Sequence, residues 1–499
     1  MTEAAEKQLA YAFAKDKGLV VMTGRDQLTL GVRNGADPFC LVEARRVLRA
    51  PFALESLEPA AFDRQLSETY ARGDLDGGEA EAALAGQEDL ASLVDGIPQT
   101  ADLLDGDDDA PVIRLINGLI YEAVKRRASD IHVEPYEDKL SIRYRIDGVL
   151  QEVLTPSRRL APPLVSRIKV MARLDIAEKR VPQDGRISLS IGGRSIDVRV
   201  STLPSRYGER VVLRLLDAQQ AKLDLEELGM DADTLARFKE ALAEPNGVIL
   251  VTGPTGSGKT TTLYSALTLL NDGARNILTV EDPIEYGLPG VGQTQVNEKV
   301  GMTFAAGLRA ILRQDPNVIM VGEIRDPETA QIAVQSSLTG HIVLSTVHTN
   351  SAAAAITRLR DIGVEPFLLS STIRAILAQR LVRRLCSQCK ERYEPDPATL
   401  ELMQIPPGSD VAFYRPRGCM ACSNTGYNGR LGVYELMTVE PSIRQMINES
   451  AAEQDIEAAA FKDHDTLFAN GRRRVISGDT SPEEVLRVCR REGEGHGGV

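Results

Sequence analysis

The sequence predicts an α/β protein whose largest domain is a parallel sheet flanked by helices. Between residues 223 and 385, short apolar segments alternate with helical ones, which is the pattern of such a sheet. One apolar segment, residues 247–252, runs directly into a glycine-rich loop and then into a helix. Alternating strands after residue 128 predict a separate α+β domain in front of this core, and a small domain precedes both.

The composition is that of an ordinary multidomain soluble protein. The 499 residues suffice for three or four domains of ~100–200 residues each, with 43% apolar and 26% charged residues. No apolar stretch approaches the ~18–20 residues that cross a membrane. The N-terminus lacks the basic start and apolar segment of a signal peptide. We therefore expect a cytoplasmic protein that has no direct membrane insertion and reaches a membrane only through a partner.

The net charge of −13 is concentrated in one segment. Residues 72–110 contain twelve aspartates and glutamates against one arginine, together with turn-forming Asp-Gly pairs. We predict an acidic linker here, part of which, residues 80–93, has helical character. Because the rest of the chain is close to neutral, we expect no nucleic-acid partner.

Two predicted domains lie on either side of this linker. Residues 1–71 form a small N-terminal domain, with strand candidates at 18–24 and 28–32 and a helix at 57–72. Residues 111–220 form the α+β domain, which begins with a helix. Its predicted strands are residues 131–135, 140–148, 187–191, 194–200 and 210–216.

The C-terminal half divides into three predicted segments. Residues 221–385 form the parallel-sheet core, residues 386–430 hold two Cys-x-x-Cys pairs, and residues 431–499 are helical. Of the six cysteines, Cys40 and Cys489 stand outside the pairs. In a chain with cytosolic character, paired cysteines of this kind favour metal binding over disulfides.

Residues 253–260 match the pattern G-x-x-x-x-G-K-T of a phosphate-binding loop. The glycines let backbone N–H groups point at phosphate oxygens, and the following helix adds the positive end of its dipole. Lys259 is predicted to bridge the β- and γ-phosphates of ATP, and the Thr260 hydroxyl to bind Mg²⁺. A chance glycine-rich turn is disfavoured because a strand and a helix flank the motif. The predicted nucleotide-binding residues are Gly253, Pro254, Thr255, Gly256, Ser257, Gly258, Lys259, Thr260 and Thr261.

Two more apolar strands of the core end in acidic residues. Residues 276–280 run into Glu281 and Glu285, and residues 317–321 run into Glu323. Acids just past the carboxyl ends of parallel strands lie where such a sheet binds its ligands. They can complete the Mg²⁺ shell, for which we name Glu323, or orient and deprotonate the attacking water. The sequence does not separate these roles, and Glu285 can also be a solvated turn residue.

A fourth apolar strand, residues 342–347, is bracketed by His341 and His348. Isolated histidines are usually structural. Two histidines at the ends of one core strand are candidates for sensing the γ-phosphate or for linking to a neighbouring subunit. We therefore include both among the candidate catalytic residues.

The two cysteine pairs, Cys386 with Cys389 and Cys419 with Cys422, are separated by 29 residues. Four thiolates in two such pairs suit tetrahedral Zn²⁺, with each pair forming one knuckle. Since sulfur takes every position, no site is left open for water, and the metal is predicted to be structural. Four unrelated thiols are the main alternative. A redox pair is less favoured because neither pair opens a helix after a strand.

Together these stretches resemble the secretion and pilus-assembly ATPases, and within that family the ATPases of type II secretion. The resemblance covers residues 128 to 430. It rests on ASDIHVEP and RYRIDG for the family's second N-terminal domain, GPTGSGKTTTLY for its Walker A loop, ILTVEDPIEY for its aspartate box, VIMVGEIRDPETA for its Walker B segment and LTGHIVLSTVHTN for its histidine box. The Walker B segment carries Glu323 where most P-loop enzymes have aspartate.

The resemblance implies a RecA-like core that assembles into a ring-shaped homohexamer and hydrolyses ATP with Mg²⁺. It also implies that arginines complete an ATP site between the two large domains of a subunit. The matching positions are Arg199 and Arg214 in the α+β domain and Arg309 and Arg313 in the core. A guanidinium there neutralises charge that develops on the γ-phosphoryl group, although each arginine can instead form a surface salt bridge.

The resemblance further implies that residues 1–71 dock onto the cytoplasmic domain of an inner-membrane secretion component. An inner-membrane platform protein is the second expected partner, which makes the protein peripheral at the inner membrane. The implied function is to power pseudopilus assembly and the export of folded proteins. Type II secretion and pilus-assembly ATPases carry a four-cysteine element, whereas pilus-retraction ATPases lack it, so retraction is disfavoured.

Three other functions stay open at this point. A type IV pilus assembly ATPase uses the same chemistry, although the short N-terminal region, with room for one docking module, favours secretion. A nucleic-acid motor would use the cysteine segment as a zinc ribbon, but the near-neutral body and the absence of tryptophan argue against it. A non-catalytic scaffold gated by ATP is disfavoured by the intact Lys259 and Thr260.

Overall fold

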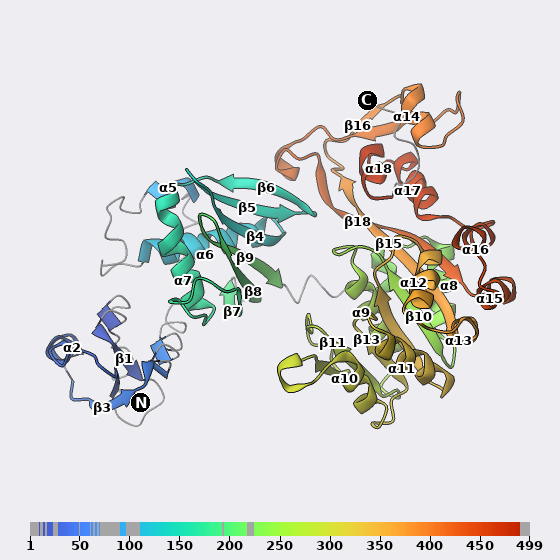
Figure 1. Ribbon diagram of the computed structural model, residues 1–499. Helices are drawn as coiled ribbons and strands as arrows, with labels where there is room; N and C mark the ends of the chain where they lie inside the picture. The colour runs from blue at the N-terminus through green and yellow to red at the C-terminus, as the bar shows by residue number, and fades with distance from the viewer. Residues whose placement is uncertain are drawn as a thin grey trace. The chain divides into compact units, whose positions relative to one another are not determined.

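The computed structural model of the chain divides into two compact units, Met1–Ala218 and Gln219–Val499, and Figure 1 shows the sheets and helices of each. Each unit has its own sheets and its own apolar cores. The residues that the structure describes are 9, 13–14, 17–22, 28–48, 50–59, 61–62, 65–66, 69, 90–95, 110–191, 194–216 and 224–489.

The first unit begins with a three-stranded sheet in the order β1-β2-β3. Its elements are β1 (Leu19–Met22), β2 (Thr29–Arg33), α2 (Cys40–Leu48) and β3 (Ala53–Leu57). β1 and β2 pair antiparallel and confirm two predicted strands. β3 is an addition to the predicted elements, and it pairs in parallel with β2 because α2 carries the chain back across the sheet.

Little of the predicted acidic linker is described. Between residues 72 and 110 the described part consists of α5 (Leu90–Asp95) and Ala110, so most of the helix predicted at 80–93 lies outside the described residues. The helix predicted at 57–72 is described in part, and its residues 59, 61–62, 65–66 and 69 are helical.

A six-stranded antiparallel sheet forms the rest of the first unit, in the order β6-β5-β4-β9-β8-β7. The strands are β4 (Ala128–Pro135), β5 (Leu140–Ile146), β6 (Val149–Leu154), β7 (Gln183–Ile191), β8 (Arg194–Ser205) and β9 (Gly208–Leu216). All five predicted strands are present, and β6 adds a sixth. Helices α6 (Ala110–Lys125) and α7 (Ala161–Met171) bury their apolar residues against one face of this sheet.

The second unit is built on a seven-stranded sheet in the order β12-β11-β13-β14-β10-β15-β18. All neighbours pair in parallel except β15 and β18, which pair antiparallel. The predicted parallel sheet is therefore confirmed, and β18 extends it beyond residue 385. The strands are β10 (Gly247–Thr252), β11 (Ile277–Glu281), β12 (Gly292–Gln295), β13 (Val318–Val321), β14 (Ile342–Val347), β15 (Ile373–Leu385) and β18 (Tyr427–Thr438).

Strand β10 lies inside this sheet, and both of its faces are buried. Val248 and Leu250 point into one apolar cluster, and Ile249 and Val251 point into the other. Helices on both faces explain why β10 reads as an unbroken apolar run rather than as an alternating one. The helices are α8 (Ala232–Leu242), α9 (Lys259–Leu270), α10 (Phe304–Ile311), α11 (Pro327–Leu338), α12 (Ala352–Asp361) and α13 (Pro366–Thr372).

The C-terminal part interrupts and then covers the sheet. The chain between β15 and β18 forms a small insert. It consists of the hairpin of β16 (Glu391–Tyr393) and β17 (Phe413–Arg415) together with α14 (Pro397–Leu402). The helices predicted from residue 431 begin only after β18, and they are α15 (Pro441–Asn448), α16 (Glu453–Ala460), α17 (Leu467–Ile476) and α18 (Pro482–Cys489). Short 3-10 turns are η2 (Arg158–Leu160), η3 (Leu225–Leu228), η4 (Glu298–Val300) and η5 (Met420–Cys422).

A buried carboxylate fastens two helices to the antiparallel edge of this sheet. Glu435 on β18 is 1% exposed and accepts N–H hydrogen bonds from Ala352 and Leu467, both at 2.9 Å. These two residues begin α12 and α17, so the charge satisfies two helix N-termini at once. Within the described ranges, each helix is too short or too polar to cross a bilayer.

Candidate functional site

The glycine-rich loop joins the carboxyl end of β10 to the first turn of α9. Gly253, Gly256 and Gly258 have φ values of 149°, 80° and 88°, which side chains rarely tolerate. A Cβ atom on Gly253 would lie 2.5 Å from the carbonyl oxygen of Gln379. Glycine is therefore required where the loop passes closest to β15, and the resulting turn lies at the N-terminus of α9, where a phosphate group is favoured.

The Lys259 ammonium lies over this loop. Its Nζ donates hydrogen bonds to the carbonyl oxygens of Gly253 and Pro254, at 2.8 and 3.1 Å. Burial lowers the pKa of Lys259 to about 8, against the opposing charge of Glu323 and with help from the cation of Arg380. An anion next to this ammonium would stabilise its charged form, which burial disfavours.

Gln379 on β15 holds the loop from the neighbouring strand. Its Nε2 donates to the carbonyl oxygen of Ser257 at 2.6 Å, and its Oε1 accepts from the Thr262 hydroxyl at 2.8 Å. The side chain is 1% exposed. Sequence reasoning did not find this residue, because a lone glutamine in an apolar strand becomes informative only when the pairing of β10 with β15 is known.

The acid that follows β13 lies beside Lys259. Glu323 is 9% exposed and forms an ion pair with Arg325, and the His348 Nε2 lies 3.4 Å from its Oε2. Burial and the Lys259 cation hold the pKa of His348 below its usual value, although Glu323 opposes this shift. The structure therefore brings together Lys259, Glu323 and His348, and it adds Arg325 to them.

Hydrogen bonds between strands explain this convergence. The Thr252 hydroxyl, at the end of β10, donates to the carbonyl oxygen of Val347 at 3.0 Å. The Thr346 hydroxyl donates to the carbonyl oxygen of Gly322 at 2.7 Å. Side chains on β10 and β14 thus fasten the carboxyl ends of the three strands that carry the loop, Glu323 and His348.

The two glutamates at the end of β11 and just beyond it, Glu281 and Glu285, have different surroundings. Glu281 is 3% exposed, and both of its carboxylate oxygens accept hydrogen bonds within the fold, from Tyr264 on one side and from Thr279 and Gln293 on the other. Glu285 lies four residues further along the chain and is half-buried. Of these two acids, Glu285 is therefore the one placed toward solvent.

His341 lies at the opposite edge of the sheet from the loop. It precedes β14, and its carbonyl oxygen accepts from the Gly247 N–H at the amino end of β10. Its ring Nδ1 lies 2.8 Å from the carbonyl oxygen of Ser336. A strand rises ~3.3 Å per residue, so His341 and His348 are roughly 20 Å apart. The structure brings only His348 of this pair to the loop, and a role of His341 toward a neighbouring subunit stays a prediction.

The two candidate arginines of the core lie on or just after α10. Arg309 forms an exposed ion pair with Glu328 in the first turn of α11. Arg313 follows the helix, and its guanidinium donates to the carbonyl oxygen of Arg309 at 2.8 Å. In the described part of the core, neither arginine forms an ion pair with Glu281, Glu285 or Glu323.

The other two candidate arginines lie on the sheet of the first unit. Arg199 on β8 is directly opposite Arg214 on β9, which in turn is opposite Asp130 on β4. The Arg214 Nε donates to the Asp130 carboxylate at 2.9 Å. Residues in register across strands share one face, so both guanidinium groups belong to the face that α6 and α7 leave uncovered.

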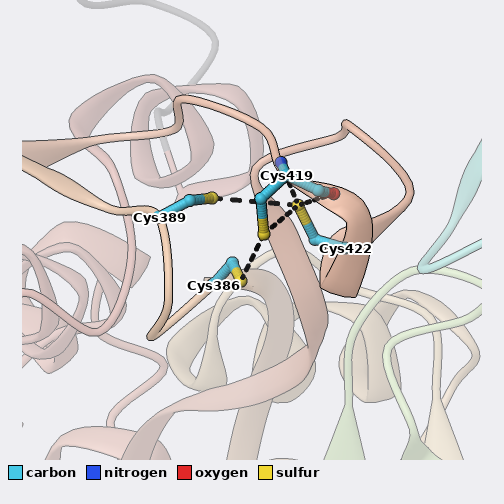
Figure 2. A group of neighbouring side chains, drawn as sticks. All are labelled: Cys386, Cys389, Cys419 and Cys422. Carbon is cyan, nitrogen blue, oxygen red and sulfur yellow. Dashed lines mark hydrogen bonds between the residues drawn. The ribbon is translucent and has the colours of Figure 1, made fainter.

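The four paired cysteines converge on one point (Figure 2). Cys386 and Cys389 follow β15, whereas Cys419 precedes η5 and Cys422 is its last residue. The sulfur atoms of all four lie within 4.8 Å of one another. Three sulfur pairs are 3.7, 3.8 and 3.9 Å apart. Four sulfurs bound ~2.3 Å from one zinc ion would be ~3.8 Å apart, so the donors fit a tetrahedral zinc site.

Backbone groups around the cluster favour thiolate. Burial opposes ionisation of the Cys422 thiol. The N–H groups of Cys419 and Gly426, both 3.2 Å from its sulfur, and the neighbouring Cys419 and Cys389 thiols outweigh this effect and lower the pKa of Cys422 to about 6. Because zinc binds the deprotonated sulfur, this environment is suited to a metal. Cys386 N–H also donates to the carbonyl oxygen of Gly426, which ties the two knuckles together.

Comparison with known families gives two matches that together span most of the chain. The family model described as "Type II/IV secretion system protein" matches residues 105–487. A second model, which describes one domain of "GSPII protein E", matches residues 8–70.

Relatives are similar over nearly their whole length. Type II secretion system protein E of Pseudomonas aeruginosa is 54% identical over 489 residues, covering 98% of this chain and 97% of that protein. Type II secretion system ATPase E of Vibrio cholerae is 52% identical over 490 residues, covering 97% of each.

Two solved structures resemble the chain over three quarters of its length. The pilus retraction motor PilT with bound ADP is 28% identical, with a TM-score of 0.52, and the match covers 75% of this chain and 97% of PilT. The ATPase DotB of Legionella pneumophila has a TM-score of 0.56, covering 75% of this chain and 94% of DotB. At 20% identity, the likeness to DotB shows the fold alone.

Replacing Cys389 with serine tests the metal site. We expect zinc affinity to fall by more than ~100-fold, because even residues that merely orient metal ligands contribute ~10–100-fold. Zinc retained after dialysis against a chelator measures the effect. Cys40→Ser is the matched control, since Cys40 is a buried thiol that lies outside the cluster. Equal zinc in the two variants would contradict the site.

Replacing Gln379 with leucine tests its hold on the loop. The change keeps the side-chain size but removes the hydrogen bonds that Gln379 makes with Ser257 and with Thr262. Each lost buried hydrogen bond costs ~1–3 kcal/mol. We therefore expect the affinity for ADP, measured by calorimetry, to fall by ~10-fold or more. Gln445→Leu, on the exposed face of α15, is the control. Unchanged ADP affinity in Gln379→Leu would show that the loop holds its shape without this residue.

Proposed function

The chain belongs to the family of type II/IV secretion system proteins and is an ATPase of that family, and from this premise we propose that it powers a type II secretion system. In this proposal, ATP hydrolysis at the glycine-rich loop drives assembly of a pseudopilus, which exports folded proteins. The observation that carries it is the convergence of Lys259, Glu323 and His348 at one edge of a parallel sheet. Similarity to type II secretion proteins over 97–98% of the chain supports secretion rather than pilus assembly.

The loop holds the substrate, and the acid after β13 serves the metal. Backbone N–H groups of residues 253–261 and the N-terminus of α9 bind the phosphates, and the Lys259 ammonium bridges the β- and γ-phosphates. Thr260 and Glu323 hold Mg²⁺, which neutralises charge on the phosphate oxygens when bound. His348, whose Nε2 lies 3.4 Å from the Glu323 carboxylate, senses the γ-phosphate in this proposal.

Glu285 acts as the general base in this proposal. Its half-buried position allows it to orient the attacking water and accept its proton. Glu281 is unsuited to this task because both of its oxygens already accept hydrogen bonds inside the fold. In this proposal Glu281 has a structural role and Glu285 a catalytic one.

Assembly completes the site. The chain forms a homohexamer in this proposal, and four arginines neutralise charge on the transferred phosphoryl group. These are Arg199, Arg214, Arg309 and Arg313. Arg199 and Arg214 carry their guanidinium groups on the sheet face opposite to the one that α6 and α7 cover.

The N-terminal domain supplies the attachment. Residues 8–70 match a domain of GSPII protein E, and the proposal is that they bind the cytoplasmic domain of an inner-membrane secretion component. A platform protein in the same membrane is the second partner in this proposal, and conformational changes driven by ATP hydrolysis act on it. The protein is then peripheral at the membrane, and the zinc knuckles keep a structural role.

Two substitutions separate binding from chemistry. Lys259→Ala removes the ammonium from the phosphate site, so we expect loss of both ADP binding and ATP turnover. Glu285→Gln keeps the size of the side chain but removes the base, so kcat is expected to fall by ~10²–10⁴-fold with ADP affinity retained. Phosphate release and calorimetry measure the two effects.

The control for these variants is Lys239→Ala, which removes a surface lysine paired with Glu226. It is expected to behave as the wild-type protein does. Wild-type turnover in Lys259→Ala would refute the site, and wild-type kcat in Glu285→Gln would move the role of base to another acid.

Mixing two inactive variants tests the arginines across subunits. Arg214→Ala alone is expected to lose activity on the order of 10³-fold, as for other arginines that act on a γ-phosphoryl group. If Arg214 serves a neighbour, mixing it with Lys259→Ala restores part of the activity, because some sites then combine one intact residue from each chain. No recovery, or dilute monomer as active as assembled protein, would contradict action between subunits.

A further inference from the structure

One buried hydroxyl group joins the helix of the phosphate loop to the segment that carries Glu285. Tyr264 lies on α9, one helical turn after Thr260, and is 1% exposed. Its hydroxyl donates to the Glu281 carboxylate. It also accepts from the backbone N–H of Glu285 and from Nε2 of Gln293, each at 3.3 Å. A phenol has one donor and two acceptor positions, so every hydrogen-bonding position of this group is used.

Glu281 fixes the direction of that hydroxyl. Its second oxygen accepts from the Thr279 hydroxyl at 2.5 Å and from Gln293 at 3.1 Å. Burial, with Glu281 beside it, raises the pKa of Tyr264 above its usual value, so the phenol keeps its proton and remains the donor. The lone pairs of the hydroxyl are then left for Glu285 and Gln293.

Gln293 on β12 holds the same segment from its other side. Its Nε2 lies 3.2 Å from the carbonyl oxygen of Tyr286, and its Oε1 accepts from the Leu288 N–H at 2.7 Å. The Tyr286 ring packs edge-on against Tyr264, with centroids 4.6 Å apart. Backbone groups of residues 285, 286 and 288 are therefore held by Tyr264 and Gln293 rather than by a regular strand or helix.

We propose that Tyr264 is a positioning residue for ATP hydrolysis, which sets Glu285 relative to the phosphates that the start of α9 binds. The helix transmits the position because Lys259, Thr260 and Tyr264 belong to the same two turns. Glu281 and Gln293 complete the network by orienting the hydroxyl. This inference rests on the proposed function, and it explains why Glu281 is buried and fully bonded beside a site that needs a reactive acid.

Tyr264→Phe removes the hydroxyl and leaves the ring in place. We expect kcat to fall by ~10–100-fold, since a displacement of about 1 Å of a reacting group can cost ~10²-fold. The KM for ATP and the Kd for ADP are expected to stay within about twofold, because the loop and Lys259 are untouched. A defect in structure alone would weaken ATP and ADP binding together with kcat.

Tyr434→Phe is the matched control. Tyr434 is a buried tyrosine of the same unit, and its hydroxyl donates to the Leu228 carbonyl oxygen at 2.9 Å. It loses one buried hydrogen bond in the same chemical way, far along the chain from the loop and the acids. We expect a lower Tm in both variants but wild-type kcat in Tyr434→Phe only.

A double variant asks whether Tyr264 acts through Glu285. If it does, adding Tyr264→Phe to Glu285→Gln lowers kcat little further, since the base is already gone. Losses that multiply would overturn the inference, as would wild-type kcat in Tyr264→Phe. Should Tyr264→Phe fail to fold, Gln293→Met interrupts the other side of the network and carries the same expectations.

The wild-type protein distinguishes the two levels of the proposal. Absence of ATP turnover in the assembled wild-type protein would refute the proposed function and this inference with it. Turnover in the wild-type protein with full kcat in both Tyr264→Phe and Gln293→Met would refute only the positioning role.

Discussion

The parallel pairing of β10 with β14 and β15 is the constraint on which the rest of the second unit depends. Parallel strands end at the same edge of a sheet, so the glycine-rich loop, Glu323 and His348 meet there although ~90 residues separate them. The Thr252 hydroxyl fixes the end of β10 to that of β14. Gln379, on the other neighbour of β10, then holds the loop itself. The order of the strands therefore determines where the site lies, and individual side chains then complete it.

Strand β15 connects this site to the four-cysteine cluster. Gln379 and Arg380 lie in its middle, and Cys386 follows its last residue. Arg380 is 7% exposed and donates to the carbonyl oxygen of Asn350, just after His348, and to that of Val488 in the last helix. The four cysteines close the insert between β15 and the antiparallel β18, and zinc there would keep these two strands in register. One strand thus connects the glycine-rich loop with the four-cysteine cluster.

Two buried carboxylates of the second unit lie where backbone or side-chain donors satisfy them. Glu435 accepts from the first residues of two helices, and Glu281 accepts from Tyr264, Thr279 and Gln293. A buried carboxylate without such donors is strongly unfavourable. Because their hydrogen bonds are made, Glu435 and Glu281 instead hold the neighbouring helices and strands in place. The acids proposed for chemistry differ in that Glu323 faces cationic groups and Glu285 lies nearer to solvent.

The sequence by itself determined the loop at 253–260, the strand that precedes it, the acids that end two core strands and the four cysteines, because each is a local pattern of residue types at fixed spacing. It also predicted the five strands of the α+β domain through their alternation. Only the tertiary structure placed His341 at the far edge, separated Glu281 from Glu285, added β18 to the sheet and brought Tyr264, Gln293 and Gln379 to the site. These outcomes depend on strand order and on contacts between distant segments, about which local spacing carries no information.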